Sequence, residues 1–559
     1  MPRKPTSRKL LTSHSNISKP KTKSKSKSLC KQVHTEITKI IPTKIIHEYQ
    51  TSISSGINKF ISNHKSKLQH LLDTSHTIQS IQSIQSTQSY QTSRDILTPH
   101  SAHFRVGCRH LNLADDSEAA PFKIPAFIDI FRHLFTVPAI TNQLTADELA
   151  ELSGILALPT KHSIYRALNY SPVGNKLADA YASVAHQIDL TRLFPTTDFH
   201  NLLFNSFTSY TILEQIETQM NHVSICTFTY GGKQYPNFLY IFHHGHAPNS
   251  KSTKSRIQRS LLDRNLLDKL EINQIAENIL CRVVFLGDII NSPALPNRLI
   301  IFLTDAKKEI DDTLEHQRHF RTVNVNTAVT NMRDIIIYRR EELYKSIYHE
   351  LIHFHNLDFK RLPADLSQML LDTLHRTHNI SPDNEYLLYE AITESLANTL
   401  NVIYLSRGIK EFRANLANEI LFSTFQVAKI LRTCGYTNWN EFALLEDSVK
   451  DAAKYANASK QWQQDSCVFS YYVLKLYILL NLDSYWSHLL DTRMKFLTSK
   501  GHFTHLLDIF ENGRKNPKLK NIIDYLLLVD NGNASSKRIK IVKRKTKINK
   551  TLRMTCLDG

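Results

Sequence analysis

Residues 334–353 read Asp-Ile-Ile-Ile-Tyr-Arg-Arg-Glu-Glu-Leu-Tyr-Lys-Ser-Ile-Tyr-His-Glu-Leu-Ile-His, and this stretch decides the fold around it. The β-branched and aromatic run at 335–338 predicts a buried strand. From Arg340 onward, apolar residues recur every three or four positions, which predicts an amphipathic helix. These residues are Leu343, Ile347, Leu351 and Phe354. Because Pro363 cannot continue a helix, we expect this one to end near 356–358.

His349 and His353 lie one turn apart on the predicted helix, beside its apolar stripe. Two imidazoles at positions i and i+4 share a face and can bind one tetrahedral Zn²⁺ ion. Glu350 follows the first His, where it can accept a proton from a water molecule that the metal activates. The motif therefore predicts a zinc site with Glu350 as general base, and its alternative is a helix with surface histidines.

A catalytic zinc site uses three protein ligands, so the motif needs a third. A third His six residues after the second is excluded, because that position is Phe359. Glu390 and Glu394 share one face of a helix predicted over about 384–405, and they are the best candidates. His375 and His378 are an alternative source of the third ligand.

Three further histidines and one acidic residue lie near the motif or late in the chain, and none of them is expected to bind the metal. His355 lies off the face of the pair and is expected to be a bystander. Asp358 is either a helix-end residue or an acid that orients a ligand His. His502 and His505 come late in the chain and are expected to be structural.

The motif and the acidic pair together resemble the gluzincins, the thermolysin-like zinc peptidases. In that family a second helix carries the third ligand and then an acid that hydrogen-bonds a ligand His. The resemblance implies that Glu390 is the zinc ligand and Glu394 the second acid, although the reverse assignment stays open. This chain departs from the family at Glu394, where the family has Asp, and at Tyr389, where it has Asn.

A looser resemblance, to metallopeptidases inferred in large DNA viruses, spans about 320–475 and is specific around 323–394. Zinc peptidases often pair an extended substrate with a strand upstream of the active helix, and residues 323–330 are the candidate for it here. A hydrolase also needs a donor for the developing oxyanion. Tyr471 and Tyr472 are the candidates, and the alternative is that both are core or surface tyrosines.

The net charge of +18 belongs to the two ends of the sequence. Residues 1–31 hold ten Lys/Arg and no acid, and residues 533–559 hold nine Lys/Arg and one acid, so the part between is neutral. Such segments cannot bury a core, and we expect disordered tails. They fit non-specific contact with nucleic acid or nuclear targeting, and equally a purely solubilising role.

Seven dispersed cysteines without a C-x-x-C pair predict reduced thiols and an intracellular protein, in the host cytoplasm or nucleus or in a virion. The sequence shows no apolar signal segment, so we expect no secretion. Val468–Leu482 is too short to span a bilayer and contains Lys475, so it predicts a core helix and no membrane association.

We expect four regions: a low-complexity basic segment over 1–100, a helical region over 101–205, a zincin-like domain over 206–532 and a basic tail over 533–559. Within the first, apolar spacing over 44–72 allows an amphipathic helix, whereas the x-Gln-Ser repeat of 78–91 fits no regular element. Strands are predicted at 223–230, 234–242, 283–286, 299–303, 323–330 and 335–338.

The predicted fold class is α+β, with a mixed sheet, an active-site helix and then a helical lobe. The sequence favours a zinc metallopeptidase that acts on polypeptides. The alternative is a basic-tailed scaffold or virion protein whose metal site is structural or inactive.

Overall fold

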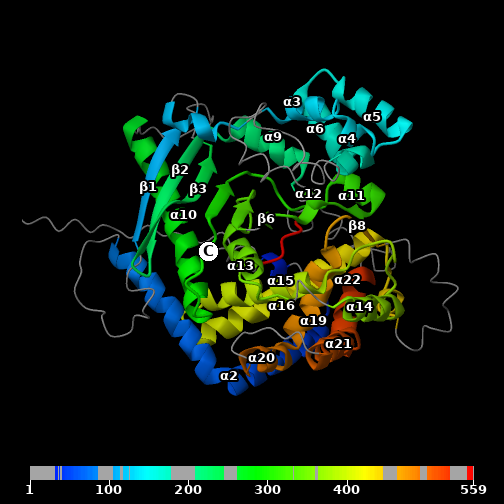
Figure 1. Cartoon of the computed structure of the whole chain (residues 1–559). Coiled ribbons are helices and arrows are strands. Elements are labelled where there is room, and N and C mark those ends of the chain that lie inside the picture. The colour runs from blue at the N-terminus through cyan, green and yellow to red at the C-terminus, as the bar shows by residue number, and fades with distance from the viewer. Residues whose placement is uncertain are drawn as a thin grey trace, which may run out of the picture.

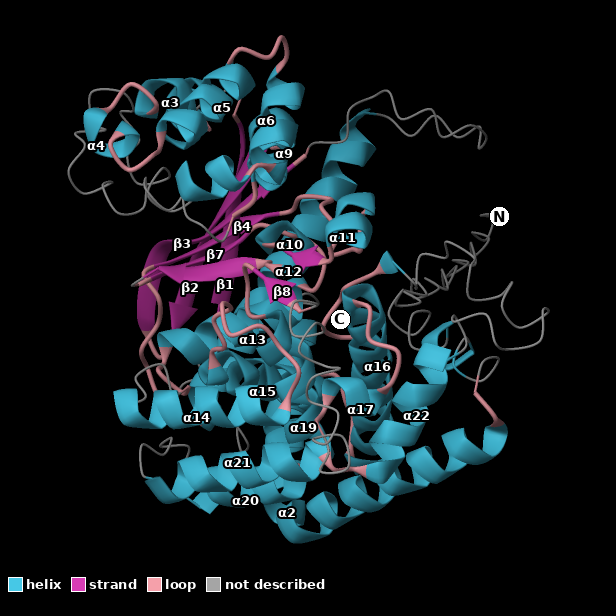
Figure 2. Ribbon diagram, turned by 90° about the vertical axis from the view of Figure 1, so that its right-hand side faces the viewer, coloured by secondary structure: helices cyan, strands magenta, loops and turns pink. Residues whose placement is uncertain are grey.

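The computed structural model describes residues 32–35, 37, 41–85, 105–113, 117–124, 126–177, 208–244, 261–331, 333–358, 363–444, 462–491, 500–528 and 550–557. These residues form a mixed α/β structure in which helices cover both faces of one six-stranded sheet (Figures 1 and 2). The predicted α+β class is confirmed in the sense that the structure combines helices with one mixed sheet. None of the described helices combines the length and apolarity that a membrane span requires.

The strand order in the sheet is β1-β2-β3-β4-β7-β6. The strands are β1 (Arg105–Asn112), β2 (His222–Tyr230), β3 (Lys233–His243), β4 (Arg298–Phe302), β6 (Ala328–Asn331) and β7 (Asp334–Ile337). β3, β4 and β7 are parallel to one another, while β6 runs antiparallel to β7 and forms one edge. A separate short pair joins β5 (His319–Phe320) to β8 (Gln463–Gln464).

The strands predicted at 223–230 and 234–242 are confirmed as β2 and β3, which pair as a hairpin across Gly231 and Gly232. Both glycines have positive φ, 56° and 77°, a backbone region that is costly for other residues. The predicted strands at 299–303 and 335–338 correspond to β4 and β7.

Successive side chains of the central strands enter two different hydrophobic cores, as the period of two in a strand requires. Ile300 and Ile336 belong to the core shared with the helices that follow β1, whereas Leu299 and Ile335 belong to the larger core. The helices that share the core of Ile300 and Ile336 are α3 (Phe127–Leu134), α4 (Pro138–Thr141), α5 (Ala146–Leu156), α6 (Lys161–Tyr170) and α9 (Tyr210–Gln219). These helices lie together on one side of the sheet (Figure 2).

The larger core holds a helical body on the opposite face of the sheet (Figure 2). Its main helices are α10 (Leu261–Ile289), α13 (Leu343–Phe354), α14 (Ala364–Thr377), α15 (Leu388–Tyr404), α16 (Ile409–Cys434), α19 (Lys475–Leu480), α20 (Leu482–Asp491), α21 (Lys500–Arg514) and α22 (Pro517–Leu528). Short helices α11 (Asp312–Gln317), α12 (Thr322–Val325) and α17 (Trp439–Phe442) also belong to it, and a π-helical turn, Phe469–Leu474, leads into α19. The predicted core helix at 468–482 is therefore confirmed as helical and buried.

The long helix α2 (Thr43–Gln85) lies along the helical body, at the lower edge of Figures 1 and 2. The apolar residues that predicted a helix over 44–72 are all buried against that body: Ile46, Tyr49, Ile53, Ile57, Phe60, Ile61, Leu68 and Leu71. The amphipathic helix that the sequence allowed over 44–72 is therefore present, because this stripe buries enough apolar surface to order it. The expectation of disorder is wrong for 73–85, over which α2 continues. The x-Gln-Ser repeat continues α2 up to Gln85, and its remainder lies outside the described residues.

One strand prediction is wrong, and a second is right only in part. Residues 283–286 lie inside α10, because a short apolar run cannot by itself distinguish a buried strand from a buried helix. Within 323–330 only 328–330 is strand, since 323–325 forms part of helix α12. The helical prediction for 101–205 missed β1, and residues 178–207 lie outside the described part.

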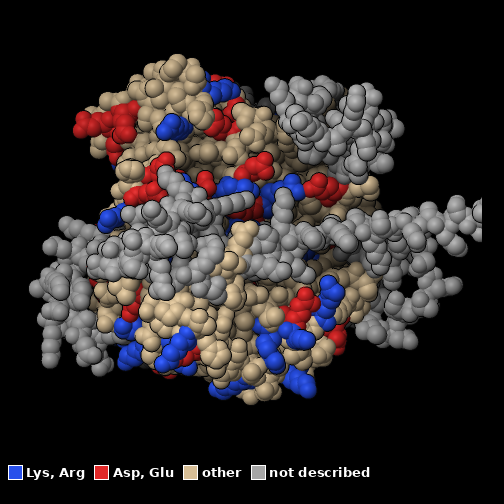
Figure 3. Space-filling view, turned by 180° about the vertical axis from the view of Figure 1, so that it is seen from behind, with Lys and Arg blue, Asp and Glu red and all other residues tan. Residues whose placement is uncertain are grey.

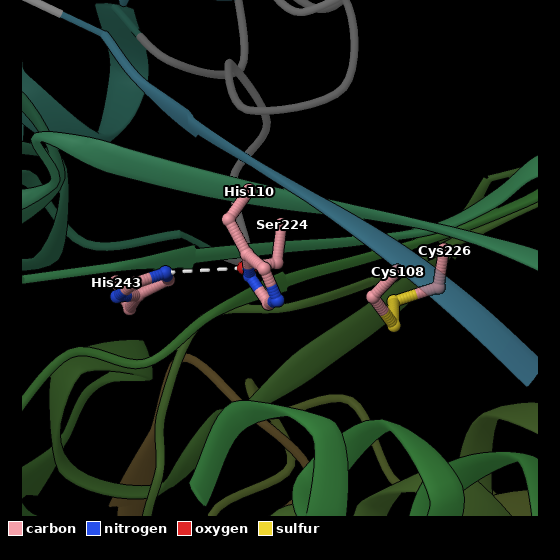
Figure 4. The surroundings of a disulfide bond; sticks show 5 residues. All are labelled: Cys108, His110, Ser224, Cys226 and His243. Atoms are coloured by element: carbon pink, nitrogen blue, oxygen red, sulfur yellow. Dashed lines mark hydrogen bonds between the residues drawn. A yellow bond between two sulfur atoms is a disulfide. The ribbon is translucent and has the colours of Figure 1, made fainter. Parts of the chain in front are cut away.

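Cys108 and Cys226 face each other across β1 and β2 and form a disulfide, so the prediction of reduced thiols is wrong for this pair (Figure 4). Cysteines 118 residues apart in sequence carry no local signal of pairing; the strand register brings their Cα atoms to 4.0 Å. Beside them, Ser224 lies between His110 and His243, at 2.7 and 3.2 Å from their ring nitrogens.

The tail prediction for 533–559 is wrong for 550–557, which is buried in the helical body. Averaging the charge over the whole tail concealed four apolar residues at its end, Leu552, Met554, Cys556 and Leu557. Residues 529–549 lie outside the described part, as do 1–31, so the predicted nucleic-acid contacts of the tails are not located. On the face seen in Figure 3, the described acidic and basic side chains are interspersed, in keeping with the neutral body.

Candidate metal centre

Helices α13 and α15 pack side by side beneath the sheet and carry the predicted ligands (Figures 1 and 2). His349 and His353 lie on one face of α13, and Glu390 lies in the first turn of α15. The Nε2 atoms of the two histidines are 3.2 Å apart. Oε2 of Glu390 lies 3.3 Å from Nε2 of His349 and 3.5 Å from Nε2 of His353. Three donor atoms thus surround one point.

These three distances fit a tetrahedral zinc ion. Bonds of about 2.0–2.2 Å and tetrahedral angles place neighbouring ligand atoms about 3.3–3.6 Å apart. Oε2 of Glu390 is buried and has no hydrogen-bond partner of its own, although a buried carboxylate oxygen is normally satisfied. Across the described residues, His349, His353 and Glu390 are the group able to hold a metal ion. The residues present therefore fit the metal that the sequence predicts.

Each candidate His ligand meets a carboxylate on its outer nitrogen. Nδ1 of His349 is 2.9 Å from Oε2 of Glu394, and Nδ1 of His353 makes a short contact with Oδ2 of Asp358. Such contacts orient a ring and leave its other nitrogen to face the metal. Of the two acids weighed for the third ligand, Glu390 lies on the Nε2 side of the histidines and Glu394 on the Nδ1 side. Asp358 takes the orienting position, although its place at a helix end suggested a simpler role.

The electrostatics of the cluster favour a bound cation. Burial would lower the pKa of His353, but Glu390 and Asp358 outweigh it and raise that pKa to about 10. The pKa of His349 is also raised, because its contacts with Glu390 and Glu394 overcome burial. Burial would raise the pKa of Glu390, yet the two histidines hold it well below its usual range. A metal ion would replace the protons that these groups otherwise attract.

Lys345 is a member of the site that the sequence reading missed. It lies one turn before His349 on α13, and its buried Nζ donates to both carboxylate oxygens of Glu394, at 2.8 Å each. The ion pair fixes the acid that contacts His349. The signal was present in the sequence, since residues 345, 349 and 353 follow one another at intervals of four along the same helix face.

Glu350 lies beside the cluster but is not one of its three donors. Its carboxylate is buried, and its Oε2 accepts a 2.7 Å hydrogen bond from Oγ1 of Thr330 on the edge strand β6. Thr330, which sequence reasoning did not single out, thereby orients the carboxylate. Its position within the predicted substrate-pairing segment was the available clue.

The two tyrosine candidates separate in the structure. The ring of Tyr471 lies 6.0 Å from that of His349, next to the cluster. Tyr472 is fully buried and donates its hydroxyl to the carbonyl of Leu552, so its prediction as an oxyanion donor is wrong. The two residues are adjacent on a π-helical turn. The ring of Tyr389 lies 6.0 Å from that of His353 and was not predicted to be there.

The other histidines considered from the sequence do not join the cluster where the structure describes their side chains. His378 meets the hydroxyl of Tyr477 at 3.1 Å, and His375 packs against Tyr386. His355 contacts the ring of Phe354, and His505 meets Ser484. The side chain of His502 lies outside the described part.

We predict that Asp358→Ala weakens zinc binding about 10–100-fold, because His353 loses the carboxylate that orients its ring. Competition with a fluorescent zinc chelator measures the affinity. Asp365→Ala, at an exposed position in the first turn of α14, is the matched control and should bind zinc as the unmodified protein does. Equal affinities for both variants would mean that the Asp358 contact does not support the metal.

Comparisons with protein-family models, with curated proteins and with solved structures find no match to this chain. The candidate site therefore stands on its own geometry.

Proposed function

We propose that this protein is a zinc-dependent peptidase with a gluzincin-like arrangement of ligands. His349, His353 and Glu390 would hold one Zn²⁺ ion, Glu394 and Asp358 would orient the histidines, and Glu350 would act as general base. The observation that carries the proposal is the set of mutual distances, 3.2, 3.3 and 3.5 Å, between three donor atoms from two helices. Three protein ligands, rather than four, are typical of catalytic zinc.

The residues around the cluster support hydrolysis. Zinc, when bound, supplies Lewis acidity that acidifies water and polarises a carbonyl group. Glu350 accepts a proton from the attacking water and delivers it to the leaving amine. Thr330 holds the carboxylate of Glu350 in place for both transfers.

The edge strand β6 supports a polypeptide substrate. An extended peptide can add to the edge of a sheet through main-chain hydrogen bonds. Thr330 lies on β6 and contacts Glu350, so a peptide paired there would pass close to the general base. Tyr471, next to His349, is the remaining candidate to stabilise the oxyanion.

Metal removal tests the proposal. The purified protein should contain one zinc ion per chain by elemental analysis and should cleave an unfolded polypeptide such as labelled casein. We expect 1,10-phenanthroline to abolish cleavage and one equivalent of Zn²⁺ to restore it. A protein that binds zinc but shows no chelator-sensitive cleavage of unfolded polypeptides would support the alternative, a scaffold with a structural or inactive metal site.

A further inference from the structure

Residues 550–557 form a segment that lies inside the helical body. The side chains of Leu552, Met554, Thr555 and Cys556 are at most 3% exposed. In Figure 1 this short red segment lies among the green and yellow helices in the middle of the molecule. A basic, low-complexity stretch precedes it in the sequence, so its burial needs a specific cause.

The main-chain N–H groups of the segment are bound by acidic side chains. Oε1 of Glu342 accepts from the amides of Met554 and Thr555, at 2.6 Å each. Oε1 of Glu419 accepts from the amides of Cys556 and Leu557, at 2.9 and 3.0 Å. Both glutamates are fully buried.

Amine and amide side chains bind the main-chain carbonyls. Lys475 Nζ and Asn398 Nδ2 donate to the carbonyl of Met554, at 2.8 and 3.2 Å. Asn401 donates to Leu557 at 3.2 Å, and Gln426 donates to Arg553 at 2.5 Å. At the start of the segment, main-chain bonds of 2.7 Å join Lys550 to Ile310 and Leu552 to Lys308.

We call the residues that make these contacts the channel. They bind the main chain of a peptide segment through its N–H and carbonyl groups. Glu342, Glu419 and Lys475 are buried charges, which are costly unless hydrogen bonds and opposite charges compensate them. The segment supplies hydrogen bonds to all three. Its removal would take these hydrogen bonds away and leave Glu342 with only its buried ion pair to Lys308, at 2.7 Å, among the contacts described here, so the channel and the segment stabilise each other.

The channel also joins the two helices that carry the candidate metal ligands. Glu342 is the N-cap residue of α13, and Asn398 and Asn401 belong to α15. Lys345, which holds Glu394 against His349, lies with its Nζ 3.7 Å from the sulfur of Met554. The seated segment therefore contacts both ligand helices and the residue that positions a ligand.

We propose that this channel is a peptide-binding site filled by residues 550–557, and that seating of the segment is coupled to metal binding at His349, His353 and Glu390. The coupling rests on the metal site of the proposed function and not on hydrolysis. Linkage makes it reciprocal: zinc holds the segment in place, and the seated segment raises the affinity for zinc. The segment thus acts as a switch for the metal centre.

The thiol of Cys556 reports on seating, because it is buried and outside the disulfide. The full chain is treated with N-ethylmaleimide, with and without one equivalent of Zn²⁺, and peptide mass spectrometry follows Cys556. We expect zinc to slow labelling about tenfold, within the usual range of coupling between sites. His349→Ala should label at the zinc-free rate under both conditions. A labelling rate that zinc does not change in the unmodified protein would overturn the coupling.

A variant of the segment tests the opposite direction. Leu552→Asp places a charge at a fully buried position, whereas Leu528→Asp makes the same change at a leucine that is 51% exposed. We expect Leu552→Asp to label faster at Cys556 and to bind zinc about tenfold more weakly, and Leu528→Asp to change neither. Faster labelling with unchanged zinc affinity would refute the coupling. If Leu552→Asp did not speed up the labelling of Cys556, the proposal that the channel holds the segment would be refuted.

Both measurements are independent of catalysis. Zinc-dependent labelling without peptide cleavage would support the coupling and contradict the peptidase proposal. Peptide cleavage with labelling that zinc does not change would support the peptidase proposal and contradict the coupling. Should Leu552→Asp fail to fold, the labelling of the unmodified protein with and without zinc still decides the coupling.

Discussion

Glu350→Gln is expected to abolish peptide cleavage while leaving zinc content unchanged. Gln has nearly the same shape as Glu, and its carbonyl oxygen can still accept the hydrogen bond that Thr330 donates. An amide cannot take up a proton from water at neutral pH, so the general base is lost. Catalysis by such a base contributes about 10²–10⁴-fold, and we expect a loss of about 10³-fold in kcat/KM. Initial rates on labelled casein measure it.

The design separates catalysis from folding. Zinc content by elemental analysis should stay at one per chain, because Glu350 is not among the three donor atoms of the cluster. The control is Glu411→Gln, the same change at a residue that contacts Arg407 at the start of α16. Cleavage that survives Glu350→Gln at the control rate would exclude Glu350 as the base.

His349→Ala should produce the largest loss of zinc affinity. It removes one of three ligands and also one of the two partners of Glu394 described above, the other being Lys345. If the three ligands share a binding free energy of about 10 kcal/mol, one ligand contributes about 3 kcal/mol, which corresponds to a loss of about 10²-fold in affinity. Chelator competition gives the dissociation constant.

His355→Ala is the matched control, since His355 caps the same helix but contacts Phe354 rather than the cluster. It should bind zinc with the affinity of the unmodified protein. Equal affinity for His349→Ala and His355→Ala would mean that zinc binds elsewhere, and the proposed centre would be abandoned. Circular dichroism on both variants verifies that the helices remain folded.

Some of this structure could be predicted because its cause is local. A repeat of three to four residues identifies α13, and two glycines identify the turn between β2 and β3. The same periodicity identified the buried face of α2. Where the local signal was ambiguous, the prediction failed: Val283–Leu286 is apolar in a strand or in a buried helix, and only its position within the 29 residues of α10 decides.

Residues 550–557 show a structure that amino-acid composition cannot predict. Their basic neighbours suggested a solvated tail, yet Glu342, Glu419 and Lys475 bind the main chain from three different helical segments. No property of the segment itself reveals these partners, which lie at least 79 positions away. The Cys108–Cys226 disulfide was missed for the same reason.

The sequence by itself determined that His349 and His353 share one face, because 3.6 residues per helical turn leave no other arrangement. It also limited the third ligand to a few candidates. Only the tertiary structure decided that Glu390 meets both Nε2 atoms while Glu394 and Asp358 meet the Nδ1 atoms. The spacing along a helix follows from covalent geometry and main-chain hydrogen bonds. The approach of two helices depends on the packing of the whole core, including a segment more than 150 residues further along the chain.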